Sequence, residues 1–289
     1  MTQNAQAMNL ATLGCDTHVH VIGSPAHYPM VAQRHYTPGP ASTDDLQQHL
    51  KRQALGRVVI VQPSVYGTHN QCLLDALANL PQARGIAVLD TNIQDSVLQQ
   101  FDAQGVRGIR LNFESAANHS AEQLKNALLH WGPRLAPLGW HIQVYAPFEA
   151  TVACADTLAT LPVPVVLDHF ALWPHNTHDT PAHQRLLTLL QAGHIYIKLS
   201  ASYRLPAFTK PALQQLAHRL LQHRPDRLLW GSDWPHTNRE PGVDAHAISR
   251  YRNIDPHQLY QERQDWLHTP KLQQSVLIDN PARLYRFGD

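Results

Sequence analysis

The feature that most constrains the fold is a short apolar run that recurs eight times along the chain. Several runs, such as Val58–Val61 and Val165–Leu167, are apolar throughout. Continuous apolar runs are typical of strands that are buried on both faces of a parallel sheet. The eight expected strands are Cys15–His20, Arg57–Gln62, Arg84–Leu89, Arg107–Asn112, Trp140–Tyr145, Pro164–His169, His194–Leu199 and Arg227–Gly231.

Segments with leucines at helical spacing separate these runs. Ser42 precedes Leu46 and Leu50 as a helix-capping residue would, and Asn280 stands as a cap before Pro281 at the start of a last helix. The alternation predicts an α/β fold. Eight units favour closure into a (β/α)8 TIM barrel over the alternative, an open doubly wound sheet. We expect one barrel domain over residues 13–289 and a flexible tail over residues 1–12.

Composition excludes several classes of protein. The chain has 289 residues, 43% of them hydrophobic, which is enough for one large buried core. Its 23 basic and 22 acidic residues give a net charge of +1 without a basic cluster, which argues against nucleic acid or an anionic membrane as a partner. Three separated cysteines and the absence of a signal-like start or of a ~20-residue apolar run predict a cytoplasmic protein. A homodimer is left open.

Polar residues stand where the expected strands end, which is where barrel enzymes place their chemistry. In Asp16-Thr17-His18-Val19-His20 the two histidines are two residues apart and therefore point the same way from a strand. This spacing suits two imidazoles on one metal ion, and the structural alternative is a pair of hydrogen-bonded core histidines. Asp233 follows the last strand as a base or ligand would, or as a turn residue.

Asp168 and His169 close the sixth expected strand, and their structural alternative is a half-buried pair that bonds only to the backbone. These features agree with a longer set of motifs that spans nearly the whole chain in order. The chain resembles the amidohydrolase superfamily and, within it, the branch of 2-pyrone-4,6-dicarboxylate hydrolases and related lactonases. The motifs that carry this resemblance are CDTHVHVIG, RHYTP, VVIVQPS, GVRGIRLNF, LGWHIQVY, VVLDH, LLWGSDWPHTN and DNPARLY.

The resemblance implies a role for each matching residue. Asp233 would be the general base that activates water, and the scissile carbonyl would be polarised by His18, His20 and His169. The residues that would hold the substrate are Tyr36, Ser64, Arg110, Tyr145, Arg204 and His236. A lactone is a reactive ester, so such an enzyme mainly positions water and stabilises the oxyanion, while arginine forks bind a carboxylate.

Some of these residues have ordinary structural alternatives. Arg107 and Arg110 are three apart, so they lie on opposite faces of a strand, and Arg110 is expected to face the site. Arg204 could be an ordinary loop charge, and Tyr36 an aromatic plug that packs its loop onto the barrel.

Two departures from the family pattern bear on the substrate. The dicarboxylate hydrolases carry further arginines where this chain has Ala116 and Leu172. We therefore expect a lactone with one carboxylate, or a sugar lactone, with Trp173 and His175 shaping the altered pocket.

The metal requirement is a further question. The expected strand that ends at Tyr145 lacks the histidine of many amidohydrolases, because His141 stands too early in it. We expect that no metal is required. If zinc binds, its ligands would be His18, His20, His169 and Asp233.

The sequence thus predicts an enzyme that opens or closes the ring of a small carboxylated or hydroxylated lactone. Three alternatives stay open. They are a metal-dependent amidohydrolase or decarboxylase, a sugar-acid lactone isomerase, and a barrel that binds a metabolite without converting it.

Overall fold

The computed structural model describes residues 3–114, 120–175 and 179–288, so Ala116 lies outside the described residues. All eight expected strands are present, each within two residues of its predicted bounds. They are β1 (Cys15–Val19), β3 (Arg57–Val61), β4 (Ala83–Ala87), β5 (Val106–Asn112), β6 (His141–Tyr145), β7 (Val165–Leu167), β8 (Ile195–Ser200) and β9 (Leu228–Gly231).

These strands form one sheet in the order β1-β3-β4-β5-β6-β7-β8-β9. The segment that follows β9 pairs with β1, because Trp234 forms a parallel bridge with Val19 and Asp233 N donates to His18 O at 2.9 Å. The strand order therefore returns to its start, and the fold is the predicted (β/α)8 barrel.

Helices follow the strands as the leucine spacing predicts. Ser42 and Ser120 each make a reciprocal capping box, with Asp45 and Gln123. The longer helices are α2 (Thr43–Arg52), α3 (Gln71–Asn79), α4 (Asp95–Ala103), α5 (Ala121–Leu135), α8 (Pro181–Ala192), α9 (Lys210–His223) and α10 (Pro256–Trp266). The shorter ones are α6 (Phe148–Ala153), α7 (Ala155–Thr160), α11 (Pro270–Gln274) and α12 (Asn280–Tyr285).

Helices stand near both ends of the chain. Asn280 is the first residue of α12 rather than its cap, because its buried side chain donates to Pro225 O and Leu228 O at 2.8 Å each. It therefore holds the start of β9 in place. At the other end, Gln3–Leu13 forms helix α1, and the backbone of Thr12 lies against Gly56. The boundary between a tail and a domain stays a prediction.

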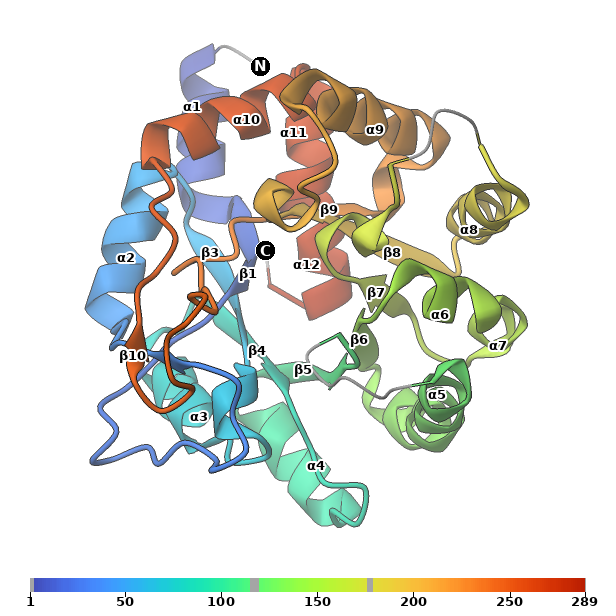
Figure 1. The fold of residues 1–289 in the computed structure, drawn as a ribbon. Helices are drawn as coiled ribbons and strands as arrows, with labels where there is room; N and C mark the ends of the chain where they lie inside the picture. The colour runs from blue at the N-terminus through green and yellow to red at the C-terminus, as the bar shows by residue number, and fades with distance from the viewer. Residues whose placement is uncertain (1–2, 115–119, 176–178, 289) are drawn as a thin grey trace. The chain divides into compact units, whose positions relative to one another are not determined.

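The chain divides into two compact units, which Figure 1 allows the reader to trace by label. The first unit comprises residues 1–107 and 231–264, and it contains β1, β3 and β4. The second unit comprises residues 108–230 and 265–289, and it contains β6, β7, β8 and most of β5 and β9. Each unit contributes its own cluster of buried polar side chains.

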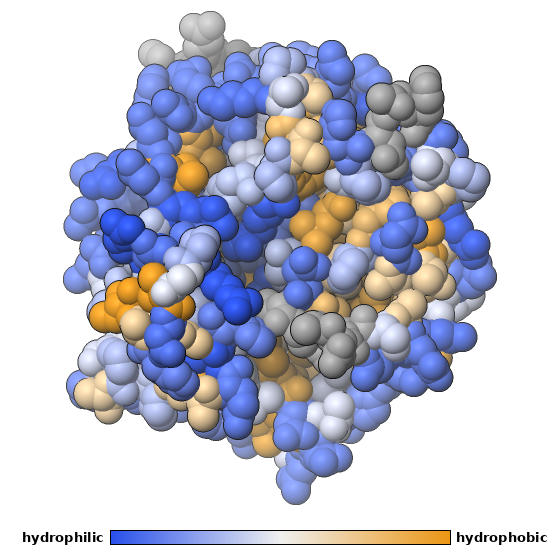
Figure 2. Space-filling view, viewed as in Figure 1, coloured by the Kyte–Doolittle hydropathy of each residue, from blue (hydrophilic) through white to orange (hydrophobic). Residues whose placement is uncertain are grey.

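The first unit also contains a pair of short strands that the sequence analysis does not predict. β2 (Thr37–Pro38) and β10 (Ile248–Ser249) come from loops more than two hundred residues apart and pair in parallel. Thr37 Oγ1 donates to Ala245 O at 2.7 Å, and Tyr251 donates to Gly39 O. Ile248 is 68% exposed, and Figure 2 shows an apolar patch over β10. Among the described helices, none has the length and apolar character of a membrane span.

Candidate active site

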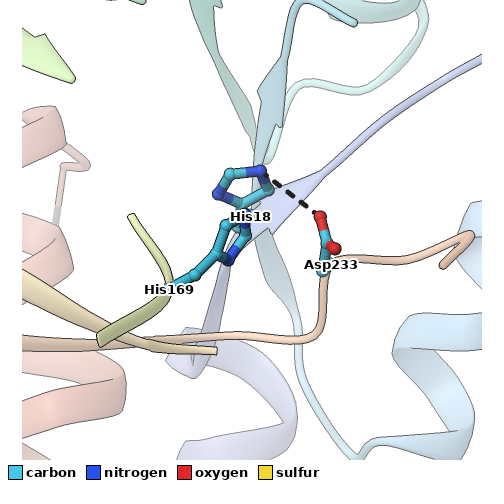
Figure 3. A group of neighbouring side chains, drawn as sticks. All are labelled: His18, His169 and Asp233. Carbon is cyan, nitrogen blue, oxygen red and sulfur yellow. Dashed lines mark ion pairs between the residues drawn. The ribbon is translucent and has the colours of Figure 1, made fainter. Parts of the chain in front are cut away.

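The first unit brings together three of the predicted catalytic residues. His18 and His20 leave the end of β1 on the same side, as their spacing predicts, and their rings meet edge to face at 5.1 Å. Asp233 Oδ1 lies 3.5 Å from Nε2 of each histidine. All three side chains are buried, and Figure 3 shows the ion pair of His18 and Asp233. A carboxylate held between two imidazoles is suited to moving a proton.

The backbone around Asp233 adopts uncommon conformations. Asp233 and His236 have positive φ angles, 61° and 67°, and His236 N donates to Asp233 O at 2.7 Å. Aspartate tolerates this left-handed region better than most residues. Gly231 is required by close approach, because a Cβ at this position would lie 2.6 Å from His18 Cβ. The segment after β9 therefore runs directly against the histidine strand.

Sequence reasoning gave no role to Asp16, which is fully buried beside these residues. Its Oδ1 accepts from His18 N at 3.2 Å and from Ser232 N at 2.9 Å, and its Oδ2 accepts from His49 Nε2 at 3.1 Å. Burial, the largest influence, raises the pKa of Asp16. The hydrogen bonds and charge of His49, with the bonds from Ser232, outweigh it and hold that pKa below its usual range.

The second unit holds a buried network of charged and amide side chains. Arg110 donates from Nε and Nη2 to Asp168 Oδ2, both at 3.3 Å, and Gln143 donates to the same oxygen at 3.0 Å. Lys198 Nζ donates to Gln143 Oε1 at 2.7 Å and lies 3.6 Å from Asp168 Oδ1. Two cations thus share one carboxylate. Sequence reasoning assigned roles to neither Gln143 nor Lys198.

The two arginines of β5 take opposite faces of the strand. Arg107 donates to the backbone and carboxylate of Asp102 at the end of α4, so it faces the helix layer. Arg110 pairs in register with Gln143 and joins the buried network instead. Two residues three apart on a strand take opposite faces.

Tyr145 lies beside two arginines and one histidine of the second unit. The guanidinium carbon of Arg110 lies 5.3 Å from the centre of its ring and that of Arg204 lies 5.7 Å away. His169 meets the same ring edge to face at 5.0 Å. Arg204 therefore contacts the ring on which the Arg110 side chain also lies.

His169 begins a run of four consecutive left-handed residues. Residues 169–172 have φ angles between 48° and 56°, and each such non-glycine residue costs roughly 1–2 kcal/mol. Phe170, which is buried against Trp266, anchors the run, and Ser200 Oγ lies 2.9 Å from His169 Nδ1. Strain of this size persists only where the surroundings fix it, and such sites are often functional.

The other expected substrate contacts lie at the ends of their strands or in loops. Ser64 is half-buried and starts the turn η1 (Ser64–Tyr66) directly after β3. Tyr36 is half-buried and directly precedes β2. The pKa of the Tyr251 phenol is raised, mainly by burial and then by the charge of Tyr36. Trp173 stacks on His183 at 5.0 Å, and His175 meets Phe208 at 4.8 Å.

Comparison with known proteins places the chain in a family. A family model described as Amidohydrolase matches residues 15–287. The chain belongs to the amidohydrolase family. A 2-pyrone-4,6-dicarboxylate hydrolase from Comamonas testosteroni is 32% identical over 93% of this chain and 89% of that protein. A 4-sulfomuconolactone hydrolase from Hydrogenophaga intermedia is 27% identical over 93% of this chain and 88% of that protein.

The structural comparison agrees with the barrel fold of this amidohydrolase. The crystal structure of a probable 2-pyrone-4,6-dicarboxylic acid hydrolase from Acinetobacter baumannii, with citric acid bound, has a TM-score of 0.79. It is 27% identical and covers 96% of this chain and 100% of its own.

Three residues of this amidohydrolase have the donor atoms for a metal ion. His18, His169 and Asp233, drawn in Figure 3, each offer one ligand atom. His20 Nδ1 donates to Val61 O at 2.8 Å, which leaves the lone pair of the neutral ring on Nε2, as in many metal-binding histidines. The donor set therefore fits a zinc ion. His141 is used elsewhere, because its ring packs on Tyr285 at 5.1 Å.

Proposed function

We propose that this amidohydrolase opens the ring of a small carboxylated or hydroxylated lactone, or closes it in the reverse direction. The observation that carries this proposal is the Asp233 carboxylate, whose Oδ1 is 3.5 Å from Nε2 of both His18 and His20. The names of the two relatives, both lactone-ring hydrolases, favour this chemistry over other amidohydrolase reactions. Barrel enzymes act at the carboxyl ends of their strands, which is where His18, His20 and Asp233 stand.

Asp233 acts as the general base in this mechanism. A carboxylate of ordinary acidity is ionised at neutral pH and can take a proton from water. The water oxygen forms a bond to the lactone carbonyl carbon, and N–H groups of His18 and His169, with that of His20 in its imidazolium form, stabilise the oxyanion. The ring C–O bond then breaks, and the leaving oxygen takes the proton from Asp233. Water is thereby added across the ester, giving one hydroxyl group and one carboxylic acid, which loses its proton to solvent and becomes a carboxylate.

The arginines of the second unit bind the substrate carboxylate in this proposal. Asp168 holds Arg110, so the guanidinium is oriented before a substrate carboxylate arrives. Arg204 lies near Arg110, because both side chains contact the ring of Tyr145. The polar groups of Tyr36, Ser64, Tyr145 and His236 complete the set of substrate contacts. Leu172 stands where dicarboxylate hydrolases carry an arginine, which favours a substrate with one carboxylate or a sugar lactone.

A metal ion is not required in this proposal, although the donor set fits one. His18, His20, His169 and Asp233 would hold a zinc ion. A bound zinc ion would polarise the carbonyl as a Lewis acid and lower the pKa of water. We further propose that the protein acts in the cytoplasm on a small molecule, without nucleic acid or membrane as a partner; a homodimer is compatible with this function.

A lactone panel tests the function. Purified protein in chelator-treated buffer is mixed with muconolactone-type, sugar-acid and pyrone lactones, and a pH indicator reports proton release. We expect release from a monocarboxylated or sugar lactone, and a loss of roughly 10²–10⁴-fold in Asp233→Asn. Full activity of Asp233→Asn, or silence across the panel with and without added zinc, would overturn the proposal.

Two further measurements separate the alternatives. Activity that returns only with added zinc would identify a metal-dependent hydrolase. In ¹⁸O-labelled water a hydrolase incorporates the label into its product, whereas a lactone isomerase moves the acyl group between hydroxyls and incorporates none.

A further inference from the structure

Two buried titratable side chains of the first unit take no part in the steps proposed above. Asp16 lies on β1, two residues before His18, and His49 lies on α2. Asp16 is fully buried and His49 is 4% exposed. Burying a carboxylate is costly unless it is paired and hydrogen-bonded, so a buried pair of this kind needs an explanation.

Asp16 ties together the two segments that carry the catalytic residues. One oxygen accepts from the backbone N–H of His18 and from that of Ser232, the residue directly before Asp233. The same two segments exchange backbone hydrogen bonds, from Asp233 N to His18 O and from His20 N to Trp234 O. Asp16 therefore acts at the crossing point from which the His18 and Asp233 side chains both emerge.

His49 holds the other oxygen of Asp16 and also touches the segment after Asp233. Its Nε2 donates to Asp16 Oδ2 at 3.1 Å, and its ring stacks on Trp234 at 5.7 Å with an interplanar angle of 29°. The ring of His236 approaches it at 6.5 Å. The ring of His49 thus contacts two residues of the segment that follows the left-handed Asp233.

We infer that Asp16 and His49 are positioning residues, which set the direction in which Asp233 and His18 present their side chains. The inference rests on the proposed function only in that Asp233 acts on the substrate. His49 on α2 thereby controls the orientation of Asp233 through its charge-assisted hydrogen bond to Asp16 and the stacking of its ring on Trp234.

This role has a kinetic signature. A misplacement of about 1 Å at the reacting atoms can cost 10²-fold in rate, so the loss should fall on kcat. KM should change by less than about twofold, because the proposed substrate-holding arginines belong to the second unit and keep their own contacts. A merely structural role would lower the amount of folded protein and leave kcat per folded molecule unchanged.

Two substitutions at His49 separate the hydrogen bond from the ring. His49→Phe keeps an aromatic ring against Trp234 and loses the donor, and we expect a kcat about 10²-fold lower. His49→Gln keeps an N–H donor for Asp16 and loses the ring. We expect this variant to keep most of the wild-type kcat. Asp16→Asn keeps an oxygen for the two backbone N–H groups. We expect its kcat to lie between those of His49→Phe and His49→Gln.

His183→Gln is the matched control. His183 is equally buried and also stacks on a tryptophan, Trp173, at 5.0 Å and 19°, but it belongs to the second unit. Glutamine also suits its place in the capping box of α8. We expect this variant to lose stability as the His49 variants do and to keep its kcat. Equal kcat values for His49→Phe and His183→Gln, or a loss confined to KM, would overturn the inference.

A crystal structure of His49→Phe makes the test independent of the substrate. We expect the separation of Asp233 Oδ1 from His18 Nε2 to depart from 3.5 Å, and an unchanged separation would overturn the inference. A wild-type protein that is silent on every lactone would overturn the proposed function alone, and the crystal structure would still decide the role of His49. If His49→Phe does not fold, the crystal structure and kcat of Asp16→Asn decide it.

Discussion

The two units bury polar clusters of different kinds. In the first unit a carboxylate stands between imidazoles, and the chain segments touch so closely that Gly231 admits no side chain. In the second unit Arg110 and Lys198 lie against one carboxylate, that of Asp168, and Gln143 bonds to both Lys198 and Asp168. Imidazoles change charge near neutral pH, whereas arginine does not. We propose that one cluster moves protons and the other holds an anion, and substitutions can test each half separately.

The largest expected effect is on the stability of the second unit. Lys198→Met removes a fully buried cation and leaves Asp168 with Arg110 and Gln143. Breaking a buried charge pair typically costs about 3–5 kcal/mol, and the remaining partners place this variant near the lower figure. Urea unfolding measures the change. Lys125→Met on the exposed face of α5 is the control, with an expected change within about 0.5 kcal/mol. Equal stabilities would show that Lys198 contributes no net stabilisation.

Gly231→Ala tests the close packing of the first unit. The new Cβ would lie 2.6 Å from His18 Cβ and 3.0 Å from His18 N, so β1 or the segment after β9 must move. We expect a loss of about 1–3 kcal/mol in unfolding free energy together with a fall in kcat. Gly39→Ala, whose Cβ would meet its nearest neighbour at 3.8 Å, should change neither. A Gly231→Ala variant with wild-type kcat would contradict the packing argument.

Arg110→Lys tests whether the second cluster binds the substrate carboxylate. Lysine keeps the charge and loses the fork that Asp168 orients, so a carboxylated lactone should bind less tightly. We expect KM to rise about tenfold, equivalent to about 1.4 kcal/mol, with kcat little changed. A lactone without a carboxylate provides the control, because its KM should be the same in both proteins. A fall in kcat alone would place Arg110 among the reacting groups instead.

The smallest effect is on the pH dependence of stability. The pKa of Asp16 is lowered in the folded protein, so its contribution is present above the ordinary value of 3.8 and is lost as pH falls through the lowered one. The difference in unfolding free energy between wild type and Asp16→Asn should therefore shrink as the pH falls from about 5 to about 2. A difference that stays constant over this range would mean that the charge of Asp16 contributes nothing.

The sequence predicted what depends on local pattern. The strands followed from apolar runs, and the shared direction of His18 and His20 followed from their spacing of two. The face of Arg110 followed from its distance to Arg107. Each of these rests on the period of a strand, which one chain segment is enough to reveal.

The missed residues depend on contacts between distant segments. His49 is one polar residue on an amphipathic helix, and only the packing of α2 shows that it meets Asp16, thirty-three positions earlier. Lys198 and Gln143 were visible as polar residues of apolar strands, but their partnership depends on strand register and side-chain length. The departure from the family at Ala116 lies outside the described residues.

The pairing of β2 with β10 has a consequence for how such barrels diversify. The loops that carry these strands share a ladder, and Thr37 and Tyr251 add hydrogen bonds from one loop to the other. A chimera that takes one loop from a relative and keeps the other would leave backbone groups without their partners. The two loops should therefore be exchanged together, as a single inherited module, when this barrel is recombined for new substrates.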